Sequence, residues 1–585
     1  MSSAAAGPPD ATLKLTGPGP RTRWLQAALA AALAVRLVTL GTYPLADTSE
    51  ARYAEIVRVM RETGNWVTLQ ETPGTPFLGK PPLYAWLSAA STYAFGLNEF
   101  ALRLPSLVCG IAVLALCGVW AAALARRPSP PASPGEARLR RASPAPLPQA
   151  GEGRNLPPLD GQSRQQAGKG SGLQGGERSP GSLPIDQEAP GRPSPTQWER
   201  GGGEGGHAPL LSCVILATTG FFIGYGAVMT DPALGLCTAW MMVAFQRAVI
   251  DGSAHALWRY GFFVAAGLAM LAKGPVAFLY VALPIVVWAF WRGRWRAIWK
   301  ALPWLRGTVL SAAISLPWYV WAEVRNPDFL SYFLIGEHVL RYLQPGWIGD
   351  RYGTAHREPF GTIWGYLAEA LGLWSIAVPA LVRPTPGWLA RARAWCQDDG
   401  RLFALLSTLV PLLVLTFASN VIWTYVMPVL TPLAALLGLE LAQQSAPPGP
   451  WRRLVNWLAG ASVALVCAGA VAWGPLHANG SSFATPVMAW RQQLPAQPGP
   501  LLYWGAKAPA SLRFYARGAA EPVPNLATRL DRLEAGSRVY VAIVPEQLAA
   551  LRQMVLIRPQ PLELTVVLRV KHAAIVRIAR TLSAS

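Results

Sequence analysis

Blocks of mostly apolar residues, each about 20 residues long, recur along most of this 585-residue chain. The hydrocarbon core of a bilayer is about 30 Å thick and takes roughly 20 apolar residues per helix, so each block is long enough to span a membrane. Hydrophobic residues make up 52% of the chain and charged residues only 14%, an unusual balance for a soluble protein. We therefore expect a polytopic α-helical membrane protein with roughly 11–13 spans. The eleven candidate spans are 24–42, 102–124, 209–229, 232–248, 257–273, 275–291, 303–322, 363–382, 402–419, 421–441 and 455–473.

Arginine and lysine residues flank these spans unevenly, and the bias predicts the topology of the chain. Cytoplasmic loops of membrane proteins are enriched in Lys and Arg. Every basic cluster falls on one side if the N-terminus is cytoplasmic; segments 43–101 and 323–362 and the tail beyond residue 474 then lie on the periplasmic side. The clusters are Arg21 and Arg23, Arg126 and Arg127, residues 292–300, Arg391 and Arg393, and Arg452 and Arg453.

Two stretches differ in composition from the apolar blocks and divide the chain into four parts. Residues 128–208 are rich in Pro, Gly, Ser and charge, so they cannot offset their ordering entropy, and we expect a disordered cytoplasmic linker. Residues 475–585 contain the strand-like "PLLYWG" and "SRVYVAIV" and the helix-like "PEQLAALRQM", which predict a small soluble periplasmic α/β domain. The other two parts are the first spans with their outer loop, 1–127, and the membrane core, 209–474.

Charge and cysteine usage exclude several classes of function. The net charge of +20 is explained largely by the basic clusters beside the spans, and no nucleic-acid recognition motif is present, so we expect no nucleic-acid partner. The remaining basic residues are suited to anionic membrane lipids. The six cysteines are scattered without a CxxC pair, which argues against a zinc site or a disulfide framework. No GxGxxG unit between a strand and a helix occurs, and no P-loop, so nothing points to a nucleotide-binding domain.

A dense cluster of charges follows the first span in "YPLADTSEARYAEIVRVM", residues 43–60. Asp47 can cap a helix whose third residue is Glu50, an arrangement typical of a capping box, and Gly64 is a natural helix stop. Apolar residues follow from Tyr53 onward with helical spacing, and charged residues occupy the opposite side. The stretch therefore predicts an amphipathic helix in the membrane interface, whose acids have either a capping role or a functional one.

Further charged residues lie at the outer ends of later spans. Each has an ordinary structural explanation: a carboxylate before a proline can cap a helix, a lysine can extend to the interface, and a histidine can be satisfied by neighbouring polar groups. Charges at the membrane edge are nevertheless functional candidates, and all of these fall on one side under the topology above. They are Lys80 in "GKPPLYAW", Asp231 in "TDP", Lys273 in "AKGPVA", and Glu337, His338 and Arg341 in "IGEHVLRYL".

Seven stretches between about residue 24 and residue 440 are shared, in order, with one protein family: "SEARYAEI", "GKPPLYAW", "NEFALRLPS", "TDP", "AKGPVA", "LPWYVWAEVRNPDFLSYFLIGEHVLRYL" and "SNVIWTYVMPVLTPLAAL". They resemble polytopic glycosyltransferases of the GT-C fold that use polyprenyl-phosphate sugars, namely the aminoarabinose lipid A transferase family and its protein O-mannosyltransferase relatives. Two positions depart from the family pattern. Ser49 stands where the family often has a catalytic Asp, so Asp47 is the candidate to supply that carboxylate. Gly79 stands where the family often has a Glu that joins a metal site with the residue matching His338, so we assign no certain cofactor and regard a divalent metal as disfavoured.

The resemblance implies a reaction in which a sugar moves from a polyprenyl-phosphate donor to an acceptor at the periplasmic face of a bacterial inner membrane. The implied acceptor is lipid A, another glycolipid or a protein. Three acids would orient or deprotonate it: Asp47, Glu50 and Asp231. Cations would stabilise the anionic phosphate leaving group. The expected residues for donor phosphate and sugar are Arg52, Tyr53, Lys80, Lys273, Glu337, His338 and Arg341.

Two other classes of function share the polytopic architecture. A transporter or flippase would also have many spans and charges at the membrane edge. It should in addition show internal repeats or broken helices paired at the midplane, and the sequence shows no repeat. A non-catalytic protein that binds sugar-lipids is the other alternative, and it is favoured by the loss of Asp at position 49.

Overall fold

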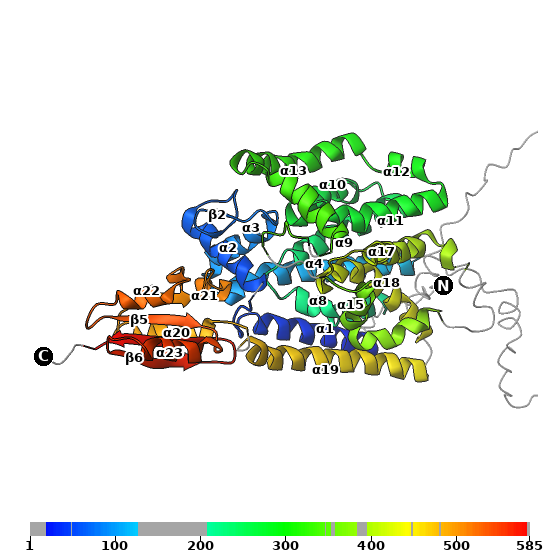
Figure 1. Ribbon diagram of the computed structural model, residues 1–585. Helices are drawn as coiled ribbons and strands as arrows, with labels where there is room; N and C mark the ends of the chain where they lie inside the picture. The colour runs from blue at the N-terminus through cyan, green and yellow to red at the C-terminus, as the bar shows by residue number, and fades with distance from the viewer. Residues whose placement is uncertain are drawn as a thin grey trace, which may run out of the picture. The chain divides into compact units, whose positions relative to one another are not determined.

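The computed structural model describes residues 19–581, except for 48, 127–206, 346, 353–356, 383–392, 394, 446–448 and 479–480. The predicted linker at 128–208 lies outside the described residues apart from its last two positions. Figure 1 shows helices over most of the described chain and a sheet near the C-terminus. This architecture confirms the predicted α-helical class with a C-terminal α/β domain.

Each predicted span coincides with one or more helices. They pack around a core rich in small and aromatic residues, in which Phe403 contacts the rings of Trp120 and Phe245. In chain order the α-helices of this part are α1 (Pro20–Thr39), α2 (Ser49–Thr63), α3 (Leu83–Phe95), α4 (Glu99–Ala125), α7 (Ala208–Ala217), α8 (Gly220–Gly224), α9 (Asp231–Phe245), α10 (Ala256–Lys273), α11 (Val276–Arg292), α12 (Trp295–Ala301), α13 (Trp304–Arg325), α14 (Arg341–Leu343), α15 (Thr362–Leu371), α17 (Asp399–Leu415), α18 (Met427–Gln444) and α19 (Pro450–Ala478). Two π-helical segments, η1 (Gln246–Ile250) and η2 (Ser331–Leu340), and two 3-10 segments, η3 (Gly372–Val382) and η4 (Trp423–Val426), lie between them.

Fewer helices are full-length spans than the block lengths predict. Within the described residues, four are long and apolar enough to cross a membrane: Glu99–Ala125, Asp231–Ile250, Trp423–Gln444 and Pro450–Ala472. Several of the eleven predicted spans are interrupted instead. The block at 209–229 breaks after α7, where the hydroxyl groups of Thr218 and Thr219 donate to carbonyls of the preceding turn. The block at 363–382 changes from α-helix to 3-10 helix at Gly372.

Helix α2 follows the first span and ends as predicted, because Gly64 adopts a φ of 66° that favours glycine. Its apolar face, which includes Ile56, is buried. Part of the charged face is also buried, since Glu55 and Arg58 are 1% and 2% exposed and pair at 2.7 Å. That face packs against α21 (Ala510–Tyr515) of the C-terminal domain. The expected amphipathic helix is therefore packed against protein along part of its charged side as well, whereas Glu62 near its end is 52% exposed.

The C-terminal domain is built on a five-stranded sheet with the order β4-β3-β5-β7-β6. Strand β3 pairs in parallel with β4 and β5, whereas β7 pairs antiparallel with β5 and β6. Alternating residues of β5, such as Val539 and Val541, pack with Leu551 of α23. The elements are α20 (Ala484–Gln493), β3 (Leu501–Trp504), α21, β4 (Ala520–Val523), α22 (Leu526–Asp531), β5 (Arg538–Ile543), α23 (Gln547–Leu556), β6 (Leu562–Arg569) and β7 (Ala574–Arg580). The predicted strands at "PLLYWG" and "SRVYVAIV" and the helix at "PEQLAALRQM" are confirmed, and a hairpin of β1 (Gln70–Thr72) and β2 (Thr75–Pro76) lies between α2 and α3.

Candidate active site

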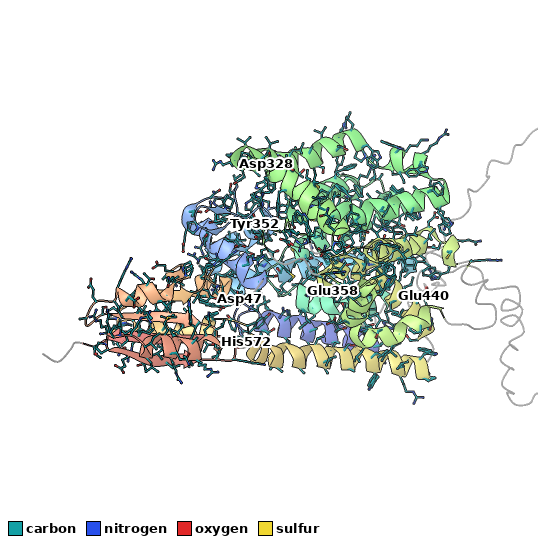
Figure 2. All side chains as sticks on the ribbon, viewed as in Figure 1. Asp47, Asp328, Tyr352, Glu358, Glu440 and His572 are labelled. Carbon is teal, nitrogen blue, oxygen red and sulfur yellow. The ribbon has the colours of Figure 1, made fainter. Side chains whose placement is uncertain are left out.

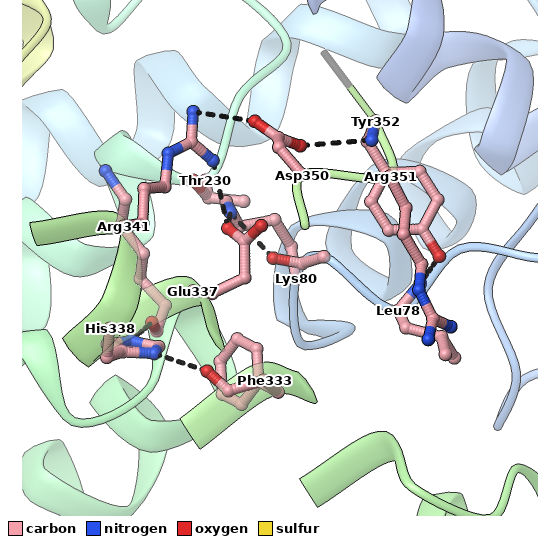
Figure 3. A network of polar contacts seen from close by, with 12 residues as sticks. Leu78, Lys80, Thr230, Phe333, Glu337, His338, Arg341, Asp350, Arg351 and Tyr352 are labelled. Carbon is pink, nitrogen blue, oxygen red and sulfur yellow. Dashed lines mark hydrogen bonds and ion pairs between the residues drawn. The ribbon is translucent and has the colours of Figure 1, made fainter. Parts of the chain in front are cut away.

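Glu337 lies on η2 and is the centre of a polar network (Figure 3). Its carboxylate accepts hydrogen bonds from Lys80 Nζ at 2.8 Å, Tyr332 OH at 3.0 Å and Arg341 Nη1 at 3.1 Å. The side chain is 4% exposed, and burial by itself disfavours the charged form. Lys80 and Arg341 more than compensate and hold the pKa of Glu337 at about 2. Glu337 is therefore an ionised anchor that fixes the positions of two cations.

The two cations held by Glu337 come from distant parts of the sequence. Lys80 precedes Pro81 and Pro82 and lies in the turn before α3, as the proline pair predicts. Arg341 follows η2, and its Nη2 lies 3.6 Å from Asp350. Its Nε is buried without a hydrogen-bond partner among the described residues. One donor of the guanidinium is therefore without a partner among the described residues.

Lys273, the last residue of α10, forms a second ion pair beside this network. Its Nζ lies 2.7 Å from Asp231 Oδ1 and 4.8 Å from the centroid of the Tyr425 ring. Both charged side chains are largely buried, so the pair is only weakly screened by solvent. Asp231 begins α9, and Gly274 turns the chain after Lys273 with a φ of 84°. The carboxylate of Asp231 holds Lys273 in place as Glu337 holds Lys80.

His338 lies between two backbone carbonyl groups. Its Nδ1 is 2.7 Å from Phe333 O and its Nε2 is 3.3 Å from Lys273 O. Burial lowers the pKa of His338, which favours the neutral ring. Among the described residues no group of three or more His, Cys, Asp or Glu side chains is placed to hold a metal ion. Gly79 has no side chain to act as a ligand, so the described residues here do not fit a metal site.

A cavity of about 370 Å³ joins these groups to an apolar wall. We call the five predicted residues that line it the cleft residues: Lys80, Lys273, Glu337, His338 and Arg341. The wall includes Val276 and Leu279 of α11 and Val414 and Leu415 of α17. Cations and apolar side chains thus line the same cavity, an arrangement that suits an amphiphile with an anionic headgroup.

Arg52 and Tyr53 lie on α2 near the cleft residues but do not line this cavity. Arg52 Nε is 3.3 Å from Glu71 Oε1. The Tyr53 ring contacts those of Phe77 and Tyr84. Burial raises the pKa of Tyr53, and the negative charge of nearby Asp231 adds to the effect, so the phenol is neutral.

Asp47 faces the C-terminal domain (Figure 2). Its carboxylate accepts a hydrogen bond from Ser511 N at 2.9 Å and a second, short one from the Ser511 hydroxyl. Ser511 lies in the first turn of α21, so Asp47 satisfies a free N–H of that helix, whereas the sequence predicts a cap on α2. Burial raises the pKa of Asp47, and the bonds from Ser511 only partly offset this. Asp47 does not line the cavity.

Glu50 pairs with Arg103 of α4. Its two oxygens lie 2.7 and 2.8 Å from Arg103 Nε and Nη2, and Arg103 also donates to the carbonyl oxygens of Leu40 and Tyr43. Glu50 accepts further bonds from the backbone N–H groups of Ala46 and Val228. Burial opposes ionisation, but Arg103 lowers the pKa of Glu50. The carboxylate is thus fully engaged in joining α2, α4 and the chain before α9.

Several network members were missed by the sequence analysis. The Glu71 carboxylate lies 2.5 Å from Lys507 Nζ and 3.3 Å from Arg52 Nε, and it forms ion pairs with both. We call the residues that join α2 to its surroundings the clamp residues: Asp47, Glu50, Glu71, Arg103 and Ser511. Arg103 lies inside the shared stretch "NEFALRLPS", so its position in a membrane helix was a usable signal. Glu71 and Ser511 had no local signal, because their partners are distant in the sequence.

Comparisons with known proteins agree with this fold. Two family models, both described as dolichyl-phosphate-mannose-protein mannosyltransferase, match residues 22–129 and 205–321. The undecaprenyl phosphate-α-4-amino-4-deoxy-L-arabinose arabinosyl transferase of Erwinia tasmaniensis is 27% identical over 451 residues, 75% of this chain and 64% of that protein. The protein of the same name from Pseudomonas aeruginosa is 30% identical over 242 residues, 40% of each chain.

A solved structure extends the similarity to the fold. The crystal structure of ArnT from Cupriavidus metallidurans bound to undecaprenyl phosphate superposes with a TM-score of 0.64 at 19% identity, covering 95% of this chain and 98% of that one. The chain aligns with 64% or less of the length of the first curated relatives that it matches. The chain is therefore a multi-pass membrane protein of the GT-C fold, similar in sequence to aminoarabinose transferases and to the models described as dolichyl-phosphate-mannose-protein mannosyltransferase.

Proposed function

We propose that the protein is an integral-membrane glycosyltransferase that moves a sugar from a polyprenyl-phosphate donor to an envelope acceptor. The observation that carries the proposal is the cavity that joins Lys80, Lys273 and Arg341 to the apolar wall of α11 and α17. The carrier chain would lie along that wall and the phosphate against the cations. The C. metallidurans structure was solved with undecaprenyl phosphate, which supports a carrier of this class.

The proposed reaction breaks the bond between the sugar's anomeric carbon and a phosphate oxygen and forms a bond from that carbon to an acceptor oxygen. The leaving group is a polyprenyl phosphate, which is a weak base and departs with the electron pair without being protonated. Negative charge grows on its oxygens, so cations held in place in advance stabilise the transition state. Arg341 contributes the guanidinium with which it lines the cavity, and Glu337 and Asp231 contribute by fixing the cations before the donor binds.

The acceptor's proton needs a base only if the acceptor is a hydroxyl group. Among the three acids expected from the sequence, Asp231 is nearest to the cavity, since it pairs with Lys273, which lines it. Asp47 and Glu50 point to Ser511 and Arg103, and we propose that they position α2. An acceptor phosphate, as on lipid A, is already ionised and would leave Asp231 only its role in holding Lys273.

The acceptor and the orientation also belong to this proposal. Curated relatives are named as aminoarabinose transferases, which favours lipid A over a protein acceptor. The positive-inside bias places the N-terminus in the cytoplasm and the cleft residues and C-terminal domain in the periplasm. Labelling of a cysteine introduced at position 70 by a membrane-impermeant reagent in intact spheroplasts tests this orientation.

A deletion strain tests the activity. Envelope lipid A and glycoproteins would be compared by mass spectrometry after deletion of the gene and after restoration with wild type, Arg341→Gln or Arg325→Gln. Arg325 is an exposed arginine at the end of α13 and serves as the matched control. We expect a sugar-sized mass that is lost on deletion and returns with wild type and Arg325→Gln but not with Arg341→Gln. Equal restoration by both variants would contradict the assignment of the cleft, and an unchanged envelope would favour transport or binding.

A further inference from the structure

A short segment of the C-terminal domain, residues 507–515, binds the outer loop that carries α2. The segment contains α21, which packs against α2 (Figure 1). Its polar side chains contact residues that precede α2 in the sequence and residues that follow it. These contacts fix α2 relative to the C-terminal domain. They join Tyr515 to Leu45 and Glu99, Ser511 to Asp47, and Lys507 and Arg513 to Glu71.

The segment begins at an edge of the sheet where α/β domains commonly bind ligands. Strand β3 pairs in parallel with β4 on one side and with β5 on the other, so the strand order reverses between β3 and β5. Open α/β sheets bind ligands in the crevice outside the carboxyl ends of the strands at such a point. Lys507 lies in the loop that leaves the carboxyl end of β3. In this protein that loop binds Glu71 of the same chain.

Glu71 is a buried carboxylate shared by three cations. Its side chain is 4% exposed and lies 3.3 Å from Arg52, 2.5 Å from Lys507 and 3.9 Å from Arg513. A buried carboxylate is costly unless it is paired. Lys507 is 62% exposed, so solvent screens its charge, whereas Arg513 is 8% exposed. Of the two partners from the C-terminal domain, Arg513 is thus the one that is shielded from solvent.

Arg513 also fixes the backbone of Glu71. Its Nη1 donates to Glu71 O at 3.0 Å, which places the hydrogen bond on strand β1. The other end of Glu71 faces α2, because Oε1 lies 3.3 Å from Arg52 Nε. The position of Arg52 therefore depends on Glu71, and the position of Glu71 depends on Arg513.

The placement of α2 affects the cleft residues. Arg52 precedes Tyr53, whose ring lies 6.4 Å from that of Phe77 and 4.7 Å from that of Tyr84, measured between centroids. Phe77 and Tyr84 stand on either side of Lys80 in the sequence. A shift of α2 would therefore disturb the turn that holds Lys80 as well as Arg52 itself. Small displacements of this kind are costly for a reaction that depends on the positions of charged groups.

We propose that Arg513 is a positioning residue for sugar transfer. From the C-terminal domain it fixes Glu71, and Glu71 holds Arg52 of α2 in place beside the cleft residues. The inference rests on the proposed function, which gives Arg52 its part in binding the donor. The C-terminal domain thereby contributes to the reaction without lining the cavity of the cleft residues.

Hydrogen exchange of the full chain in nanodiscs tests whether Arg513 holds α2. Arg558→Met is the matched control for Arg513→Met, because both arginines belong to the C-terminal domain, both side chains are 8% exposed and both pair with a carboxylate. Arg558 binds Asp531 and the carbonyl of Ala527, which lie on α22. We expect the amides of α2 to exchange about tenfold faster in Arg513→Met and at the wild-type rate in Arg558→Met. Arg558→Met should instead speed the exchange of α22.

Transfer from a labelled polyprenyl-phosphate sugar tests whether this contact matters for the reaction. We expect Arg513→Met to lower kcat about tenfold and to change the donor KM less, because the charge on the phosphate grows in the transition state. Arg558→Met should stay within about twofold of wild type. Arg513→Lys keeps a donor for Glu71 O and should recover part of the loss. The double variant Arg52→Met/Arg513→Met should match Arg52→Met alone within about twofold, since residues that act through one another are not additive.

Three results would overturn the inference. Unchanged exchange of α2 in Arg513→Met would show that this arginine does not hold the helix. Equal losses of transfer in Arg513→Met and Arg558→Met would reduce the role of Arg513 to the stability of its domain. Losses that multiply in the double variant would show that Arg513 does not act through Arg52.

The two measurements separate this inference from the proposed function. Faster exchange of α2 in Arg513→Met would support the contact between the domain and α2 even if wild type transferred no sugar, and the proposed function alone would then fail. If Arg513→Met does not fold, Arg513→Gln replaces it in every comparison, because glutamine retains at most one of the two contacts to Glu71.

Discussion

The cleft residues and the clamp residues use the same side-chain chemistry for different ends. Lys80, Arg341 and Lys273 are each held by a carboxylate, and they line an open cavity. Arg103 is equally well held by Glu50, but it also binds three backbone carbonyl groups and is 0% exposed. A network of charged residues is thus suited to ligand binding when some of its residues line a cavity. It is suited to a structural role when all of its donors and acceptors are bonded within the protein.

The largest expected effect on stability comes from a change among the clamp residues. Arg103→Met would leave Glu50 buried and unpaired, and we expect a loss of about 3–5 kcal/mol in the free energy of unfolding. Thermal unfolding of the detergent-solubilised protein measures it. Arg247→Met, which breaks the partly exposed pair with Asp251, is the matched control and should cost about 1 kcal/mol or less. Equal losses of unfolding free energy in the two variants would contradict the structural role given to the Arg103–Glu50 pair of the clamp residues.

A change among the cleft residues should reduce sugar transfer more than it reduces the stability of the protein. Lys80→Gln removes one cation from the cavity, and we expect sugar transfer to fall about 10- to 100-fold, because a charge-assisted hydrogen bond contributes about 1.5–3 kcal/mol. Turnover of a labelled polyprenyl-phosphate sugar measures the change, with unfolding temperature followed in parallel. A variant that unfolds several degrees earlier and retains full turnover would assign Lys80 to structure instead.

The pH dependence of stability distinguishes the anchor of the open network. The folded-state pKa of Glu337 is about 2, below its ordinary value of 4.5, so its stabilising effect is fully present above about pH 4.5 and is lost as the pH falls towards 2. We expect wild type to exceed Glu337→Gln by up to about 3 kcal/mol at pH 6, since each pKa unit corresponds to about 1.36 kcal/mol. The difference should shrink between about pH 4.5 and pH 2. A difference that does not change with pH would mean that ionisation of Glu337 is not what stabilises the network.

The smallest expected effect is that of Asp47→Asn on stability. Burial raises the pKa of Asp47, so removing its charge costs less than it would at an exposed site, and an amide can still accept from Ser511 N and donate to the Ser511 hydroxyl. We expect a change within about 1 kcal/mol, whereas Ser511→Ala should cost about 1–3 kcal/mol by leaving the carboxylate short of a donor. Loss of transfer by a fully stable Asp47→Asn protein would assign this carboxylate to the reaction.

The sequence predicts the parts of the cleft that depend on local rules. The proline pair after Lys80 places it in a turn, and span ends place Asp231 and Lys273 at one side of the membrane. The α/β character of the C-terminal domain follows from alternating and helical patterns that do not depend on the rest of the chain. These features need only neighbouring residues.

The partners of those residues could not be predicted from one sequence. Lys80 forms a hydrogen bond with Glu337, which is 257 positions away in the sequence, and Asp47 forms one with Ser511, which is 464 positions away. Local capping rules suggest that Asp47 begins α2, but tertiary packing turns it to another helix. The same packing buries Glu55 and Arg58, so the amphipathic pattern of α2 misleads about solvent exposure. The interruptions of the helices could not be predicted either. Hydropathy measures only the length of an apolar block and does not indicate that a helix ends within it, as α7 does before Thr218.

The assignment of the cleft residues is tested most directly by measuring the affinity for undecaprenyl phosphate in nanodiscs. Three proteins are compared: wild type, the cleft double variant Lys80→Gln/Arg341→Gln, and the control double variant Arg247→Gln/Arg325→Gln. We expect the cleft variant to bind about 100-fold more weakly, because two charge-assisted contacts to phosphate are lost, and the control variant to bind as wild type does. Equal binding by all three proteins would contradict the assignment of the cleft residues to the phosphate of a lipid-linked donor.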